Sequence, residues 1–395
     1  MRPPEKIAAE TNAVIPFHKP YITEDEIAEV VDSLRSGWLT MGPKTVRFEE
    51  KFRDYIGARD AVSMNSCTAG LHLALMAAGI KEGDEVILPA VTFTATAEVV
   101  TYLRARPVLV DVDGETYNID VGAVEEKITE KTRAVIPVHY AGQPCDMDEI
   151  CDLARRRNLT VIEDAAHAIP ATYKGRKIGT IGDLTCFSFY ATKALTTGEG
   201  GMVTTAHDAW AERMRILRLH GISKDAWKRY TGEGSWYYEV LEAGYKYNMT
   251  DIQASLGIAQ LRKLDWMWER RKQIADLYTE SFRSLDAVQT PVVKTDRESA
   301  WHLYVVKLMC DALTIDRNRF IEELKNMGTM ASVHFIPLYR HPYYRRAFQY
   351  SAAGFAVSEQ IYDQIISLPI YPGMTDEEAN QVVESVAQVI QKFRR

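Results

Sequence analysis

A run of small residues at Asn65–Gly70 has the composition of a turn that binds an anion. The run follows a short apolar stretch and opens an apolar helical pattern, which leaves backbone N–H groups free at the predicted helix start. Small side chains let a ligand approach these groups closely, and the helix dipole favours a negative group such as a phosphate. An ordinary helix capped by a Ser or Thr side chain explains the same residues without a ligand.

A second segment, Val161–His167, is an apolar run that ends in Glu163 and Asp164, followed by two alanines and His167. In an open α/β sheet, ligands bind beyond the carboxyl ends of the strands. Asp164 is therefore expected to point into the crevice, where its carboxylate could pair with a protonated ring nitrogen. A cap at the start of a helix is the alternative role for Asp164.

A third segment leads from the aromatic run Phe187–Tyr190 to Lys193 and then to the glycine turn Gly198–Gly201. Partial burial disfavours the ammonium form of a lysine and leaves a nucleophilic amine that can form a Schiff base with an aldehyde. A solvated surface lysine is the alternative.

Together the three segments offer a phosphate site, an acid to pair with a ring nitrogen and an amine nucleophile. Pyridoxal 5′-phosphate requires these three functions: Lys193 would hold its aldehyde, and Asp164 would keep its pyridine nitrogen protonated. Phe93 follows a predicted strand and could stack on the ring face, or it could be a core residue.

The elements that must position these residues lie between about residues 60 and 205, where short β-branched runs alternate with amphipathic stretches. This alternation predicts a mostly parallel sheet covered by helices. The predicted strands are Glu85–Leu88, Pro107–Val112, Ala134–Val138, Thr160–Glu163, Thr185–Phe189 and Met202–Thr205, and the predicted helices are Thr68–Ala78, Thr94–Leu103, Val121–Ile128 and Met147–Arg157.

The pattern changes after residue 250, where apolar residues at helical spacing predict one long connecting helix. Short strands and capped helices should follow it. The predicted elements are the helix Thr250–Leu285, the strands Trp301–Met309 and Met330–Phe335, a helix Asp316–Met327 capped by Asp316 or Asn318, and a closing helix Thr375–Phe393 capped by Thr375 with Asp376 and Glu377.

The composition of the 395-residue chain, 46% hydrophobic and 26% charged with a net charge of −7, is typical of a globular protein. The acidic balance argues against nucleic acid as a partner. No uncharged stretch approaches the roughly 20 apolar residues of a membrane helix, and the N-terminus lacks the apolar core of a signal peptide. We therefore expect a cytoplasmic protein without membrane insertion. The five cysteines form no CxxC pair, so we expect reduced thiols and no metal site.

Six motifs together resemble the DegT/DnrJ/EryC1/StrS family of nucleotide-sugar aminotransferases, which are pyridoxal-phosphate enzymes of fold type I. The resemblance covers almost the whole chain. The motif Gly244–Asp251 is similar to its version in the lipid A aminoarabinose branch of the family, which is the most similar branch. The motifs are Ser36–Pro43, Ser66–Gly70, Glu163–His167, Phe187–Lys193, Glu199–Gly201 and Gly244–Asp251.

The resemblance implies an α/β fold with two domains. Residues 1–250 would form a large domain around a mostly parallel seven-stranded sheet with helices on both faces, with an N-terminal arm at about residues 1–35. Residues 251–395 would form the connecting helix and a smaller α+β domain. Members of the family are homodimers with shared active sites, so the same arrangement is expected here.

Roles for individual residues also follow from the resemblance. Lys193 and Asp164 would be catalytic, with Lys193 as the Schiff-base lysine and general acid and base. The cofactor contacts would be Cys67, Thr68 and Ser188 at the phosphate, Asn248 reaching that phosphate from the other subunit, His167 beside the ring hydroxyl and Phe93 on the ring face, and the substrate contacts would be Thr40, Tyr190, His334 and Tyr339.

The chain departs from the family pattern at two of these positions. Many members have Gln where His167 stands, and His is frequent at the position of Tyr190. Both residues border the expected sugar pocket, so they bear on the identity of the substrate. A packed core histidine is the alternative role for His167.

The implied reaction transfers an amino group from L-glutamate to the keto carbon of a nucleotide-linked 4-keto sugar, releasing 2-oxoglutarate. The cofactor passes through its pyridoxamine 5′-phosphate form, and Lys193 acts as base and then as acid. Ser36–Pro43 and Gly244–Asp251 resemble the branch acting on a UDP-4-keto-pentose, whereas His334–Pro337 and His341–Tyr344 resemble branches using UDP-, dTDP- or GDP-linked 4-keto-6-deoxyhexoses. The product would enter lipopolysaccharide or other polysaccharide biosynthesis.

Two other functions occur on the same fold. Some family members are dehydratases, but these replace the Schiff-base lysine with histidine, and Lys193 is present here. A non-catalytic regulatory protein is the other alternative, and the intact set of Lys193, Asp164 and Ser188 argues against it.

Overall fold

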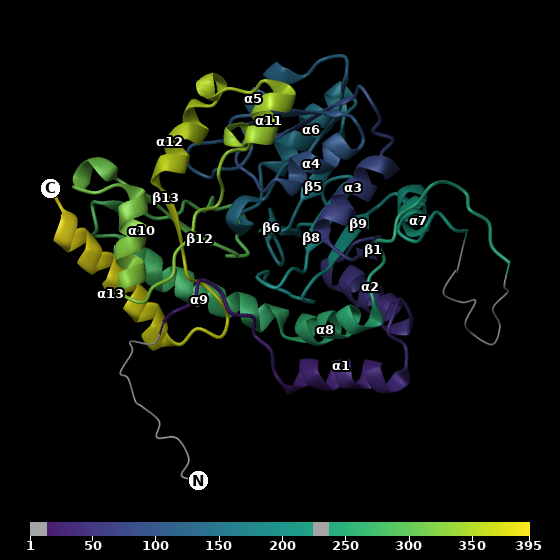
Figure 1. Ribbon diagram of the computed structural model, residues 1–395, viewed down its shortest axis with the longest axis horizontal. Coiled ribbons are helices and arrows are strands. Elements are labelled where there is room, and N and C mark those ends of the chain that lie inside the picture. Colours follow the sequence, from purple (N-terminus) through teal and green to yellow (C-terminus); the bar gives the residue numbers. More distant parts are fainter. Residues whose placement is uncertain (1–13, 224–236) are drawn as a thin grey trace, which may run out of the picture.

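The computed structural model describes residues 14–223 and 237–395, and Figure 1 shows a central sheet surrounded by helices. This sheet has seven strands. The strand order is β1-β9-β8-β5-β4-β2-β3. Strands β3, β2, β4, β5 and β8, which are neighbours in this order, run parallel to one another. Strand β9 runs antiparallel to both of its neighbours, β8 and β1. The expected mostly parallel seven-stranded sheet is therefore confirmed. Its strands are β1 (Asp60–Met64), β2 (Glu85–Pro89), β3 (Arg106–Val110), β4 (Thr132–Val135), β5 (Thr160–Asp164), β8 (Leu184–Ser188) and β9 (Gly201–Thr205).

Helices cover both faces of this sheet, so neighbouring residues of a strand enter different cores. In β5, Val161 packs with the helices of one face and Ile162 with those of the other. Burial on both faces explains why the strands are continuously apolar. One face carries α3 (Cys67–Ala77), α4 (Ala95–Tyr102) and α7 (Asp208–Leu217), and the other carries α2 (Pro43–Ile56), α5 (Val121–Lys127), α6 (Met147–Arg157) and α8 (Asp251–Arg262).

The carboxylate of Asp251 joins α8 to the N-terminal helices. This carboxylate is buried and accepts hydrogen bonds from the backbone of Gly42 at 2.8 Å and from the backbone and hydroxyl of Thr45 at 2.9 and 2.7 Å. It thereby satisfies N–H groups at the start of α2, where the helix dipole favours a negative charge. Helix α1 (Glu24–Ser36) packs along the same α8.

The single long helix predicted for Thr250–Leu285 is wrong, because the chain forms two helices there. Helix α8 ends at Arg262, and α9 (Leu264–Phe282) begins after Lys263, whose φ of −118° and ψ of 10° are not helical. The Nζ of Lys263 lies 2.6 Å from a carboxylate oxygen of Glu26 and donates to the hydroxyl of Thr23 at 2.8 Å. These tertiary contacts hold the break, and local apolar spacing does not show them.

The C-terminal part of the chain forms a three-stranded antiparallel sheet in the order β10-β12-β13, packed against helices. Asp316 caps α10, accepting from the backbone of Arg319 at 2.8 Å, and Thr375 forms a capping box with Glu378, so both predicted caps are confirmed. The elements are β10 (Val288–Gln289), β12 (Tyr304–Leu308), α10 (Arg317–Asn326), α11 (Pro342–Phe348), α12 (Ala356–Gln364), β13 (Ile365–Leu368) and α13 (Asp376–Phe393). The proposed domain boundary at residue 250 stays a prediction.

Two strand predictions in this part need correction. Residues 330–335 form no strand, since the segment makes only a single bridge, between Ser332 and Ser367 of β13. Instead, Ser332, His334 and Phe335 of this segment line a cavity. The strand predicted from Trp301 begins at Tyr304, because Trp301 has a φ of +50°.

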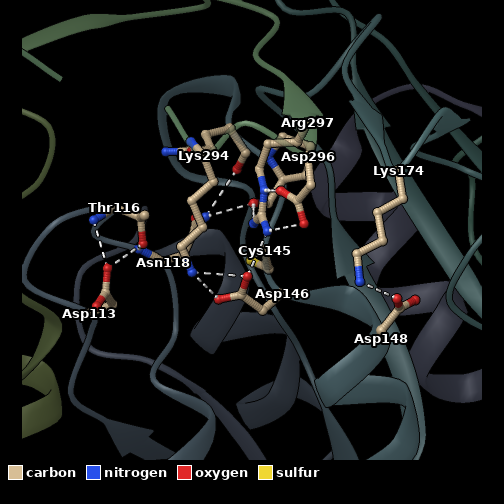
Figure 2. Close-up of polar contacts among 12 residues, drawn as sticks. Asp113, Thr116, Asn118, Cys145, Asp146, Asp148, Lys174, Lys294, Asp296 and Arg297 are labelled. Carbon is tan, nitrogen blue, oxygen red and sulfur yellow. Dashed lines mark hydrogen bonds and ion pairs between the residues drawn. The ribbon is translucent and has the colours of Figure 1, made fainter. Parts of the chain in front are cut away.

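A network of ion pairs, drawn in Figure 2, ties the connection after α9 back to the sheet domain. Arg297 donates to the carboxylate of Asp146 at 2.7 Å and to the carbonyl of Pro144 at 2.8 Å, and Lys294 lies 2.8 Å from Asp146. Arg297 also belongs to β11 (Arg297–Glu298), which pairs with β6 (Thr172–Tyr173), itself paired with β7 (Arg176–Lys177). The network therefore fixes the segment that leads directly to His302. No helix within residues 14–223 and 237–395 is long and apolar enough to cross a membrane.

Candidate active site

A cavity of about 460 Å³ lies at the carboxyl edge of the parallel strands. Its walls come from the strand ends, the start of α3, the N-terminal arm and three C-terminal segments. Most of the residues predicted from the sequence lie together in this cavity: Cys67, Thr68, Phe93, Asp164, His167, Ser188, Tyr190, Lys193 and His334.

The start of α3 forms one end of the cavity. The hydroxyl of Ser66 caps the helix by accepting from the backbone of Ala69 at 3.1 Å, while Cys67 and Thr68 line the cavity. A Cβ atom at Gly201 would lie 2.6 Å from the backbone nitrogen of Cys67, so only glycine lets β9 pack so closely against this helix start. The segment is a capped helix, as the alternative held, and it also opens onto a cavity.

Asp164 is the buried acid of the site. Its Oδ2 accepts from the hydroxyl of Thr96 at 2.8 Å, its Oδ1 accepts from the backbone of Ala166 at 3.1 Å, and the Thr96 hydroxyl lies 2.8 Å from that of Thr92. No helix follows Asp164, so the helix-cap alternative is wrong. Burial raises its pKa, although these hydrogen bonds and the charge of Lys193 oppose the rise.

The neighbouring Glu163 anchors the end of β5, a role that the sequence reasoning missed. Its carboxylate is fully buried and accepts from the backbone of Gly182 and the hydroxyl of Thr185, both at 2.7 Å. His139 Nδ1 accepts from the backbone of Cys145 at 3.0 Å, so its Nε2 carries the proton and donates to Glu163 at 2.8 Å. Two acidic residues in succession at the end of an apolar strand were the available signal.

Lys193 lies in the loop after β8, where its backbone N–H donates to the carbonyl of Tyr190 at 2.9 Å. Its side chain reaches the cavity and is half-buried. Burial lowers its pKa to about 8, although the charges of Cys67 and Asp164 act in the opposite direction. Lys193 is therefore no solvated surface lysine, and a substantial fraction of its amine is neutral near physiological pH.

Four imidazoles line the cavity: His18, His167, His302 and His334. Burial is the main reason that the pKa falls to about 3 for His18 and about 4 for His334, and the pKa values of His167 and His302 lie well below the ordinary value for the same reason. All four are neutral at physiological pH. His167 packs against His302 with ring centroids 4.3 Å apart, so it is both buried and at the cavity.

Phe93 lies at the mouth of the cavity with 57% of its surface exposed, which excludes the core alternative for this residue. Its ring centroid lies 6.0 Å from that of Phe335. An exposed aromatic face at this place is suited to stacking on a planar ligand.

Three predicted residues do not line the cavity of the single chain. Tyr339 is 1% exposed and stacks on Phe355 with ring centroids 4.4 Å apart, so it belongs to the core. Thr40 is exposed, and its carbonyl accepts from the backbone of Asp251 at 2.9 Å. The side chain of Asn248 is buried and accepts from Lys246 Nζ at 2.6 Å.

The fold and this site together define a pyridoxal-phosphate enzyme of fold type I. The chain belongs to the DegT/DnrJ/EryC1/StrS aminotransferase family, whose profile matches residues 20–387. It is 48% identical to the spore coat polysaccharide biosynthesis protein SpsC of Bacillus subtilis, over 96% of this chain and 98% of SpsC.

Two solved structures extend the comparison. The PLP-form of Spr1654 from Streptococcus pneumoniae superposes with a TM-score of 0.90 at 36% identity, covering 96% of this chain and 99% of Spr1654. Helicobacter pylori PseC, an aminotransferase involved in the biosynthesis of pseudoaminic acid, has a TM-score of 0.90 at 28% identity, covering 96% of this chain and all of PseC. The family resemblance is confirmed, whereas the aminoarabinose branch stays a prediction.

The hydroxyl of Thr96 is expected to be essential for the function of Asp164. Thr96→Val keeps the shape of the side chain but removes a hydrogen bond to a buried carboxylate, so aminotransferase turnover should fall about tenfold or more. The melting temperature should change little. Thr96→Ser, which keeps the hydroxyl, is the control, and undiminished turnover in the valine variant would contradict the role.

The lowered pKa of Lys193 predicts how the cofactor-free protein captures pyridoxal 5′-phosphate. Because the neutral amine is the nucleophile, the initial capture rate should rise about tenfold per pH unit below pH 8 and level off above it. An ordinary lysine would give a rise that continues to about pH 10.4. The measurement is the rate of borohydride-stable labelling, and a profile without a plateau above about pH 9 would refute the lowered pKa.

Proposed function

We propose that this protein is a pyridoxal-phosphate-dependent aminotransferase that moves an amino group from L-glutamate to the keto carbon of a nucleotide-linked 4-keto sugar. The observation that carries the proposal is the meeting of Lys193 and Asp164 in one cavity. Asp164 is buried and Lys193 is half-buried, and the pKa of each departs from its ordinary value. Perturbed groups with a common cavity are typical of catalytic sites.

The residues around the cavity fit the cofactor that the family implies. The start of α3, with Cys67 and Thr68, and the hydroxyl of Ser188 would hold its phosphate, and Phe93 would cover its ring. Asp164 would keep its pyridine nitrogen protonated. When bound, the cofactor supplies an electron-poor ring that stabilises negative charge on the carbon that loses a proton.

Lys193 would perform the proton transfers. Its Nζ takes the proton from the α-carbon of the amino acid in one half of the reaction and delivers a proton to the former keto carbon of the sugar in the other half. A single amine can do both because its pKa of about 8 lies near the working pH.

The neutral imidazoles favour a sugar as the acceptor. A neutral imidazole donates one hydrogen bond and accepts another, which suits hydroxyl groups better than a charged side chain does. His167 and His334 therefore offer polar contacts without adding charge. The acceptor would be a UDP-4-keto-pentose or a UDP-, dTDP- or GDP-linked 4-keto-6-deoxyhexose.

The named relatives support a place in polysaccharide biosynthesis. SpsC is described as a spore coat polysaccharide biosynthesis protein, and PseC as an aminotransferase in the biosynthesis of pseudoaminic acid. We propose that the amino sugar made here likewise enters a polysaccharide, and that the enzyme works in the cytoplasm.

We also propose a homodimer with shared active sites. Asn248 lies outside the cavity of its own chain, which is consistent with service in a partner's site. Near it along the chain, Val240 and Leu241 expose 63% and 57% of their surface, and Tyr238 exposes 47%. Large apolar side chains exposed this close together in the sequence are consistent with burial at an interface.

The catalytic assignment is tested with Lys193→Ala. The wild-type protein incubated with L-glutamate should convert its cofactor to the amino form, read as the loss of its visible absorbance, and the variant should do so at least about a hundredfold more slowly. Lys174→Ala, which removes an exposed lysine paired with Asp148, is the control. If borohydride still fixed the cofactor to Lys193→Ala, the assignment would be wrong. Reverse reactions on a panel of 4-amino nucleotide sugars identify the acceptor.

The shared site is tested by mixing two inactive variants, Lys193→Ala and Asn248→Ala. In a heterodimer one site would carry both lesions and the other neither, so exchange of subunits should restore up to about half of the activity per heterodimer. Proven exchange without recovery, or a monomer by light scattering at micromolar concentration, would refute the shared site.

A further inference from the structure

Arg271, on α9, is a fully buried arginine whose guanidinium is hydrogen-bonded, among the described residues, through only one of its three nitrogens. Its Nη1 donates to the carbonyls of Ile370 at 2.8 Å, Trp301 at 3.3 Å and His302 at 3.4 Å. Its Nε and Nη2 have no hydrogen-bond partner among the residues that the structure describes. Burial lowers its pKa to about 10, and no negative group opposes that shift. The side chain is thus a charged guanidinium without a counterion in the described part of the chain.

The free edge of this guanidinium has a specific shape. The Nε–H and Nη2–H groups point to the same side and form the fork that holds the two oxygens of one carboxylate. A buried charge without a partner is costly. An arrangement that engages Nη1 and leaves Nε and Nη2 without partners among the described residues is therefore suited to a carboxylate.

Arg271 lies directly behind the wall of the catalytic cavity. His302 and Ile370, whose carbonyls hold Nη1, both line the cavity, and so does His18. Burial is the largest cause of the lowered pKa of His18, and the positive charge of Arg271 is the second largest. The two side chains are therefore close together. His18 Nε2 and His302 Nδ1 also have no hydrogen-bond partner among the described residues. Side chains from three distant segments, each with a polar nitrogen that lacks a partner among the described residues, are thus neighbours here. We name these residues, with Ile370, the arginine wall (His18, Arg271, His302 and Ile370).

We propose that the arginine wall is the subsite that binds a carboxylate of the amino donor, with Arg271 as its positive charge. The inference rests on the proposed function, because an amino acid donor brings a carboxylate to the cavity and a nucleotide sugar does not. The acceptor brings a diphosphate, which has more charge and more oxygens than a single enclosed fork satisfies. The site therefore selects the donor and leaves the acceptor to other contacts.

A movement of the wall must accompany binding, because Arg271 has no exposed surface. His18 is the wall residue with the fewest restraints. It belongs to the arm before α1, it is only half-buried, and its ring bonds to the backbone of Ala191. His302 and Ile370, in contrast, are fixed through their carbonyls.

The test measures binding of glutarate, a dicarboxylate that has no amine and cannot react, to the cofactor-loaded protein by calorimetry. Arg271→Met should weaken glutarate binding about tenfold or more, as expected for losing hydrogen bonds to a charged group. His18→Leu should weaken it to a smaller extent. Arg270→Met is the matched control on the same helix, since Arg270 pairs with Asp376 at the surface, and it should bind glutarate as the wild type does.

Binding of UDP separates the two sources of an anion. The affinity for UDP should be unchanged in every variant, and the KM for L-glutamate should rise in Arg271→Met while the KM for the sugar stays constant. A parallel loss of UDP binding would show a phosphate site instead and overturn the proposal. Unchanged glutarate binding in Arg271→Met, or no binding of glutarate to the wild type, would also overturn it.

Further outcomes separate an error in this inference from a folding defect of the variant and from an error in the proposed function. If Arg271→Met does not fold, Arg271→Lys decides, because it keeps the charge and removes the fork, and it should lose glutarate binding but not UDP binding. If the protein transaminates glutamate and the variants bind glutarate as the wild type does, the inference about the arginine wall is wrong and the proposed function stands. Arg271-dependent glutarate binding in a protein without transaminase activity sinks the proposed function alone.

Discussion

The burial of a carboxylate at the carboxyl end of β5 is the constraint on which the rest of the site depends. Asp164 is 5% exposed and must be held ionised in a place that favours its neutral form. Thr96, the backbone of Ala166 and the charge of Lys193 supply that stabilisation. Lys193 in turn owes part of its basicity to Asp164, because burial alone would lower its pKa further. Each group therefore opposes the effect of burial on the other: the charge of Lys193 limits the rise in the pKa of Asp164, and the charge of Asp164 limits the fall in the pKa of Lys193.

The alternation of a β-strand explains how this pair is kept rigid. Successive side chains of a strand point to opposite faces, so Glu163 and Asp164 leave β5 in opposite directions. The carboxylate of Glu163 accepts hydrogen bonds from Gly182, Thr185 and His139, which are structural partners. Asp164 is thereby anchored through the backbone and is free to present its own carboxylate to the cavity. One acidic residue stabilises the strand end, and its neighbour is available for chemistry.

Local sequence patterns were sufficient for the sheet and for the residues at its carboxyl edge. Asp164 is the last residue of β5, Lys193 lies in the loop after β8, and α3 begins shortly after β1, so the position of each follows from an element with a strong pattern. His18, Arg271 and His302 could not be found in this way, because each comes from a different part of the chain and only the folded packing brings them together. The helix break at Lys263 was missed for the same reason, since Glu26 holds it from the far end of the sequence.

The charges of the cavity can now be considered together. Four imidazoles line it, yet burial keeps them neutral, so they contribute polar contacts and no field. The charged residues that line it are then Asp164, which suits a protonated ring, Glu199, and Lys193, which must lose its proton to act. Behind its wall lies Arg271, which no acid of the described chain neutralises. In the reaction that we propose, two substrates would use this cavity in turn, and only the amino acid would carry a carboxylate. A lone buried cation beside neutral histidines is therefore the arrangement that distinguishes them, because it attracts the first substrate without placing a competing charge against the hydroxyls of the second.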